Sequence, residues 1–185
     1  RDLHRLIRRQ RQMCIRDSER TVADLIYASP MHDIGKIGIP DQILLKRGKL
    51  TPDEWEVMKQ HSTIGAEILA GSEIGFIQMA EIIALNHHEK WDGAGYPRGL
   101  SGEQIPVAAR IMAVVDVFDA LTSKRPYRDA LPLEEALRII EEGRGKHFDS
   151  RVVDAFFAAK DEILSLQSEN VSEGTTQNGI NHEAF

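Results

Sequence analysis

Four histidines occupy positions where an imidazole is costly unless it has a role. His61 lies on the apolar side of a predicted helix, and His87 and His88 end an apolar run. His32 is followed directly by Asp33 in "MHDIGKIGIPD". A single histidine on an apolar face is usually a hydrogen-bonded core residue, but four histidines in such settings indicate a shared site.

A carboxylate in an apolar helix points the same way. Asp116 and Asp119 interrupt the stretch "IMAVVDVFDALTS". A buried carboxylate destabilises the fold unless it is paired or bound to a metal ion. A salt bridge to a nearby arginine would satisfy Asp116 and is the alternative to a metal site.

Neutral imidazoles and carboxylates are ligands suited to iron, manganese or zinc, and a single cysteine, Cys14, excludes a thiolate zinc site. Adjacent side chains on a helix point about 100° apart, so two consecutive ligands converge best where a helix ends. Two metal ions about 3.5–4 Å apart and bridged by Asp33 would use the whole set and hydrolyse a phosphate ester. The predicted ligands are His32, Asp33, His61, His87, His88 and Asp116.

The elements that must position these residues are all predicted to be helices. "TPDEWEVMKQHSTIGAEILAG" predicts one helix, with a capping box formed by Thr51 and Glu54 and a stop at Gly71. Its residues Met58 and His61 share a face. Strand patterns are weak throughout, so we expect an all-α domain.

Four further helices are predicted from periodicity. Residues 76–88 and 105–123 are apolar on most sides and are expected to be buried, whereas 132–143 and 149–166 alternate as amphipathic outer helices. The polar tail, residues 168–185, is predicted to be disordered.

Composition limits the functional classes. The chain has 185 residues, enough for one domain, and its net charge of −6 argues against binding nucleic acid polymers or anionic membranes. The apolar run from Ile105 to Leu121 contains charged residues, so a buried helix is a better interpretation than a membrane span. One cysteine fits a reducing compartment, and we expect a cytoplasmic protein.

Residues 1–18 differ from the acidic remainder because they are strongly basic. One interpretation is a linker arm to another domain. The other is a sequence artefact, since "MCIRDS" (Met13 to Ser18) is the translation of a transposon end used to build sequencing libraries. We therefore place the domain at residues 19–167.

Four segments together resemble the HD-GYP branch of the HD phosphohydrolase superfamily, over about Ser29 to Phe157: "HDIGK", "HHEKWDGAGYPRGL", "IPVAARIMAVVDVFDALTSKRPYR" and "GKHFD". The resemblance implies a helical HD-domain bundle around a metal site with two or three divalent ions, iron or manganese. It also implies hydrolysis of cyclic di-GMP to pGpG or GMP, as the output domain of a bacterial signalling protein. A receiver domain of a two-component system or a GGDEF-type domain would be its partner.

The resemblance also assigns roles to residues. The six predicted ligands match the family's metal positions, and Asp33 and Lys36 match catalytic positions. Lys36 matches a phosphate-contacting lysine, although a solvated surface lysine is the alternative. The other matches to substrate-binding positions are Gly95, Tyr96, Pro97, Arg125 and Arg128, for which an ordinary turn and surface charges are the alternatives.

One family feature is missing. Family members usually carry a further histidine, often with a glutamate, on a helix upstream of the His-Asp pair, and His4 is the only candidate here. The alternative function is therefore a catalytically degenerate module that binds nucleotide or partner domains. A nucleotidase acting on another phosphate ester is disfavoured by the Gly-Tyr-Pro segment.

Overall fold

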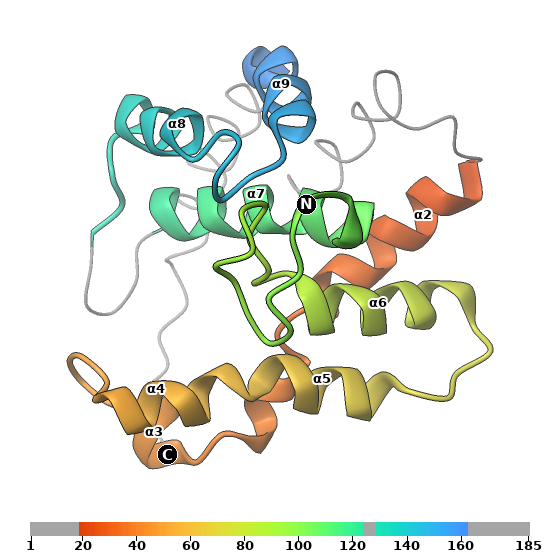
Figure 1. The fold of residues 1–185 in the computed structure, drawn as a ribbon, viewed down its shortest axis with the longest axis vertical. Coiled ribbons are helices and arrows are strands. Elements are labelled where there is room, and N and C mark those ends of the chain that lie inside the picture. The colour runs from red at the N-terminus through yellow and green to blue at the C-terminus, as the bar shows by residue number, and fades with distance from the viewer. Residues whose placement is uncertain (1–18, 124–128, 163–185) are drawn as a thin grey trace, which may run out of the picture.

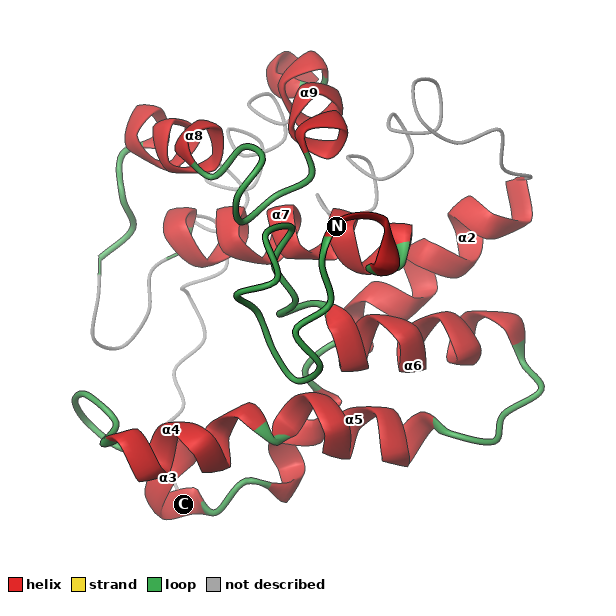
Figure 2. Ribbon diagram, viewed as in Figure 1, coloured by secondary structure: helices red, strands yellow, loops and turns green. Residues whose placement is uncertain are grey.

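The structure, a computed structural model, describes residues 19–123 and 129–162. These residues form α-helices and short 3-10 helices, with no strand among them (Figure 2), which confirms the predicted all-α class. The α-helices are α2 (Glu19–Ala28), α3 (Asp41–Leu44), α4 (Pro52–Lys59), α5 (His61–Leu69), α6 (Gly75–Asn86), α7 (Val107–Thr122), α8 (Leu133–Glu142) and α9 (Ser150–Ala158). The 3-10 helices are η1 (Ser29–Met31), η2 (Ile34–Gly38) and η3 (Gly102–Gln104).

Helix α7 runs through the middle of the bundle (Figure 1), as its apolar sequence predicts. It contacts α6, α8 and α9, and its buried side chains include Val114 and Phe118. Phe118 meets Phe156 of α9 with ring centroids 5.0 Å apart. Burial of such large apolar side chains supplies most of the stability of a helical domain.

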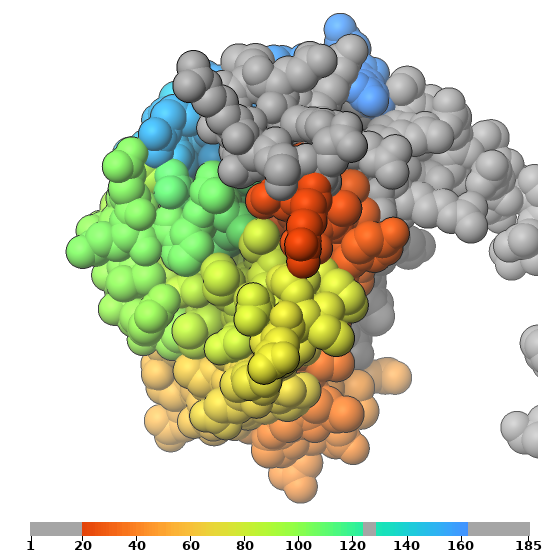
Figure 3. Space-filling view, turned by 90° about the vertical axis from the view of Figure 1, so that its right-hand side faces the viewer, coloured from red at the N-terminus to blue at the C-terminus, as the bar shows by residue number. Residues whose placement is uncertain are grey.

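Helix α6 lies between α7 and the layer that contains α5 and η2. It packs against both α2 and α5, and α5 also packs against η2. Seen from the side, the orange early helices lie at the bottom, yellow α6 in the middle and the green and blue segments above (Figure 3). The ends of α5 and α6 that carry the predicted ligands therefore meet near the centre.

The predicted helix over residues 51–71 is wrong in one respect. The capping box of Thr51 and Glu54 is present, and Gly71 adopts a φ of 78° after the last turn. The helix is interrupted at Gln60, however, where the amide bonds to the Val57 carbonyl three residues back, so α4 ends and α5 begins at His61. A one-residue irregularity of this kind does not disturb hydrophobic periodicity.

The other helices follow their predictions with shorter ends. The amphipathic α8 buries Ala136 and Ile140. Helix α9 ends at Ala158, and after a turn at Ala159 residues 160–162 are helical again, so the predicted continuous helix over 149–166 is interrupted once among the described residues. Helix α6 leaves Ile82 39% exposed and is buried on one side only. None of the described helices is long and apolar enough to cross a membrane. The tail at 168–185 lies outside the described residues.

Candidate metal centre

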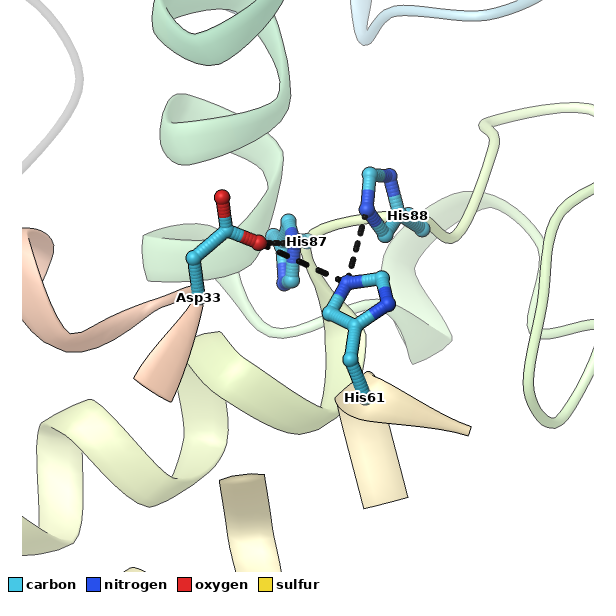
Figure 4. A group of neighbouring side chains, drawn as sticks. All are labelled: Asp33, His61, His87 and His88. Carbon is cyan, nitrogen blue, oxygen red and sulfur yellow. Dashed lines mark hydrogen bonds and ion pairs between the residues drawn. The ribbon is translucent and has the colours of Figure 1, made fainter. Parts of the chain in front are cut away.

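Four predicted ligands converge where three segments meet. One ligand atom from each of Asp33, His61, His87 and His88 lies within 4.8 Å of the others (Figure 4). Asp33 lies between η1 and η2, His61 opens α5, and the His87–His88 pair follows the last turn of α6. The expectation that adjacent ligands stand at helix ends is confirmed.

Backbone carbonyls orient three of the imidazoles. The Nδ1 of His61 lies 2.7 Å from the Met58 carbonyl, that of His32 lies 2.8 Å from the Ser29 carbonyl, and that of His87 lies 3.0 Å from the Ala84 carbonyl. A carbonyl only accepts, so each Nδ1 donates its proton. In His61 and His87, whose pKa values burial lowers, the Nε2 keeps a lone pair. This is the arrangement in which protein histidines bind metal ions through Nε2.

His87 Nε2 has no hydrogen-bond partner among the described residues, although it is buried. The carboxylate oxygen Asp33 Oδ1 is 3.9 Å from it, beyond hydrogen-bond distance. A buried acceptor without a partner destabilises a fold, and a cation in the cluster would satisfy it. The donor set and this nitrogen therefore fit a divalent metal ion.

Asp33 faces two groups of ligands at once. Its Oδ1 lies 3.5 Å from His61 Nε2, and its Oδ2 lies 3.4 Å from His32 Nε2. On that second side, His32 Nε2 is also 3.6 Å from Asp116 Oδ1. Each carboxylate oxygen of Asp33 thus faces a different group of these side chains.

Burial keeps three imidazoles neutral. It lowers the pKa of His87 to about 4 and that of His88 to about 3, and it also lowers the pKa of His61. Neutral imidazole is the form that binds metal. The same three side chains would resist protonation at neutral pH.

The pKa of His32 is shifted in the opposite direction, because two carboxylates, those of Asp33 and Asp116, lie beside it. Burial would lower the pKa of His32, but hydrogen bonds to Asp116 and Asp33 outweigh it and raise that pKa to about 10. Burial would raise the pKa values of Asp33 and Asp116, but interaction with His32 outweighs it and lowers both. Lys36 lowers the pKa of Asp33 further. The raised pKa of His32 and the lowered pKa values of the two carboxyls thus share one cause, which is their mutual attraction.

Asp119, which interrupts the same apolar stretch as Asp116, does not join the cluster. It is exposed and accepts a bond of 3.3 Å from Ser123 Oγ. Lys36 does reach the site, where its ammonium bonds Asp33 Oδ2 at 2.5 Å while 41% of its side chain stays exposed.

Two glycines make this convergence possible. A Cβ on Gly35 would clash with the His61 carbonyl and the Gly65 backbone, so η2 and α5 touch backbone to backbone. That close approach brings Asp33, two residues before Gly35, next to His61 at the start of α5. Only a residue without a side chain allows it.

The Gly-Tyr-Pro segment lies beside the centre and forms one wall of it. Gly95 lies against the backbone of residues 88–90, where a Cβ would clash. Tyr96 donates its amide to the His88 carbonyl, and its ring stacks on the His88 ring with centroids 4.8 Å apart. Burial, with the charges of Asp33 and Asp116, raises the pKa of Tyr96, so its phenol remains a donor. Pro97 is exposed.

Sequence reasoning missed the residue that holds this wall. Glu89 is 2% exposed, and its carboxylate accepts the amides of Arg98 at 2.8 Å and Leu100 at 2.9 Å. The guanidinium of Arg98 donates to Asn86 Oδ1 at the end of α6. The sequence offers one signal for a structural role of Glu89, which is its position directly after the His87–His88 pair. A glutamate next to a lysine otherwise indicates an exposed position.

The "GKHFD" segment supports the wall from behind. Buried Asp149 accepts bonds from Arg110 and Arg151, and each of these guanidiniums lies within 5.8 Å of the Trp91 ring centroid. The amide of Trp91 also bonds the His147 carbonyl. The predicted substrate contacts Arg125 and Arg128 lie outside the described residues.

The HD-domain family model matches residues 5–152. A cyclic di-GMP phosphodiesterase of Thermotoga maritima is 52% identical over 162 residues, covering 88% of this chain and 44% of the relative. The cyclic di-GMP phosphodiesterase response regulator RpfG of Xanthomonas campestris is 53% identical over 149 residues, covering 80% and 39%. A 3'3'-cGAMP-specific phosphodiesterase of Vibrio cholerae is 45% identical over 147 residues, covering 79% and 28%. The chain thus spans less than half the length of these relatives.

Solved structures share the fold. A cyclic GMP-AMP-specific phosphodiesterase of V. cholerae superposes with a TM-score of 0.64 at 21% identity, over 95% of this chain and 48% of that one. Bd1817 of Bdellovibrio bacteriovorus, an HDG"Y"P protein, gives 0.61 at 18% identity, over 84% and 49%. The likeness to these structures shows the fold, and the family match over residues 5–152 shows that the chain belongs to the HD-domain family.

Proposed function

We propose that this chain is the catalytic domain of a metal-dependent phosphodiesterase that hydrolyses cyclic di-GMP to pGpG or GMP. The observation that carries the proposal is the position of Asp33 between two ligand groups, His61 with His87 on one side and His32 with Asp116 on the other. Relatives named for cyclic di-GMP are 45–53% identical to the chain, and those named for 3'3'-cGAMP are 39–45% identical.

The ligand groups favour two ions, iron or manganese. Imidazole with carboxylate, and no thiolate, suits both metals. Divalent ions held there activate water and draw electron density from phosphoryl oxygens. His61, His87 and His88 would hold one ion, His32 and Asp116 the other, and Asp33 both. A third ion would need the upstream ligand, which falls in residues 1–18.

The surrounding side chains would bind and orient the phosphodiester. Lys36 is a cation at the edge of the ligand cluster and would pair with a phosphoryl oxygen as charge develops there. Tyr96 keeps its proton because its pKa is raised, so its hydroxyl can donate to substrate. Gly95 lets this wall approach the backbone of residues 88–90 closely. Pro97, Arg125 and Arg128 complete the proposed substrate contacts.

The proposal extends to the longer protein. A domain that spans less than half of its relatives is expected to act as the output of a receiver or GGDEF-type domain, in the cytoplasm. RpfG, one of these relatives, is itself named a response regulator.

Anaerobic incubation with Fe(II) or Mn(II) and either cyclic di-GMP or 3'3'-cGAMP tests the proposal, with products separated by chromatography. We expect pGpG or GMP, and a loss of at least about 100-fold for Asp116→Asn. Asp119→Asn is the matched control, since it changes an exposed carboxylate on the same helix. Metal analysis should find two ions in the native chain and one in Asp116→Asn. Two bound ions without hydrolysis of either substrate would favour the binding module.

A further inference from the structure

Trp55 is a large aromatic side chain that the fold does not use. It lies on α4, none of whose residues is buried, and 46% of its surface is exposed. Exposing an indole forfeits the stabilisation that its burial would supply. An exposed tryptophan near a catalytic centre is therefore a candidate for contact with a ligand.

A row of rings joins Trp55 to the metal ligands. The Trp55 and Tyr96 centroids are 6.2 Å apart with the rings at 82°, so the two rings meet edge to face and are not stacked. Tyr96 stacks on His88, whose Nε2 is 3.1 Å from His61 Nε2. Trp55 also precedes His61 by only six positions, which corresponds to about 9 Å along a helix.

The charges around this row suit a nucleotide. Lys59, one helical turn after Trp55, pairs with Glu56 at 2.7 Å and places its ammonium 5.8 Å from the Tyr96 ring centroid. Lys36 pairs with Asp33 in the ligand cluster. A phosphate bound at the cluster would meet Lys36, and the row of rings leads from there to Lys59 and the exposed indole, where the attached base would bind.

We propose that Trp55 is the base-stacking platform of this site and binds one purine of the dinucleotide. This inference rests on the proposed function and deepens it. It assigns a base of the substrate to α4 and a phosphate to the metal ligands. Stacking is equal in the bound substrate and the transition state, so Trp55 acts on binding and not on the chemical step.

Steady-state kinetics of the metal-loaded full chain test the platform. Trp55→Ala is expected to raise KM about 5- to 100-fold and to leave kcat within about twofold, because base–aromatic stacking has that strength. Trp55→Phe keeps a ring and should restore most of the affinity. Leu45→Ala removes an exposed apolar side chain next to α3 without removing a ring, and should leave KM unchanged. An unchanged KM in Trp55→Ala overturns the proposal.

Fluorescence separates this inference from the proposed activity. The chain has two tryptophans, and Trp91 lies between two arginines behind the wall. At a fixed Mn(II) concentration, GMP should quench the native emission and ribose 5-phosphate should not; Trp55→Phe should lose the quenching. If neither dinucleotide is hydrolysed, the proposed function fails and this titration alone decides the platform. Equal quenching by GMP in Trp55→Phe would overturn it.

Discussion

The Nε2 atoms of His61 and His88 lie 3.1 Å apart, in a pair of imidazoles whose pKa values are both lowered by burial. His61 Nδ1 is already engaged with the Met58 carbonyl, so its Nε2 presents a lone pair to His88. Two nitrogens bound to one ion at about 2.1 Å are roughly 3–3.4 Å apart. The pair therefore has the spacing of two ligands of the same ion.

Metal ions should stabilise the protein, and His88→Ala should remove much of that effect. At a Mn(II) concentration of about 100 times Kd, the free energy of unfolding rises by about 2.7 kcal/mol, which corresponds to a rise in Tm of about 5–10 °C for a chain of this length. Thermal unfolding with and without Mn(II) measures this shift in Tm. A full shift in His88→Ala would contradict the assignment, and Asp119→Asn should retain the native shift.

Gly35→Ala should disconnect Asp33 from His61. The added Cβ meets the His61 carbonyl and the Gly65 backbone, neither of which can rotate away, and overpacking of this kind costs about 1–3 kcal/mol. We expect a lower free energy of unfolding in urea and a weaker Mn(II) shift. Gly75→Ala is the control, because its Cβ meets only the flexible side chains of Asp24 and Arg20. Native behaviour of Gly35→Ala would show that η2 and α5 need not touch.

Much of this site could be predicted because its residues violate ordinary patterns. A histidine pair at the end of an apolar run and Asp116 inside another are visible without coordinates, and the capping box of Thr51 and Glu54 fixes where a helix starts. These signals depend on neighbours in the sequence, which periodicity and spacing record.

The parts that could not be predicted depend on contacts between distant segments. The break at Gln60 leaves the apolar period intact, and the burial of Glu89 follows from amides nine and eleven residues away. Asp119 lies only three positions from Asp116 on the same helix, yet it faces solvent. Only the packing of α7 decides which carboxylate is turned inward.

Glu89→Gln should loosen the wall of the site. Gln has one acceptor oxygen in place of two, so the amide of Arg98 or Leu100 would face an NH₂ group. An unsatisfied buried group costs about 1–3 kcal/mol. We expect faster hydrogen exchange at the Leu100 amide and a higher KM for cyclic di-GMP. Glu67→Gln, at an exposed position on α5, should change neither. Unchanged exchange at Leu100 would show that the loop holds itself.

His147 should make the metal-free protein less stable in acid. Burial, assisted by the charge of Lys90, lowers its pKa from 6.5 to about 4, against smaller opposing effects of Asp92 and Asp116. Between these two pH values the unfolded chain binds a proton that the folded chain does not, so stability falls as the pH drops through this window.

The contribution of this one residue is at most about 3 kcal/mol. His147→Gln cannot titrate, so its free energy of unfolding in urea should fall less than that of the native chain between pH 7 and pH 4.5. In the unfolded chain the histidines of the metal centre also take up protons in this range, but they are present in both proteins and cancel in the difference. Identical slopes for the two proteins would mean that His147 becomes protonated in the folded state without cost, and hence that solvent reaches its ring beside Phe148.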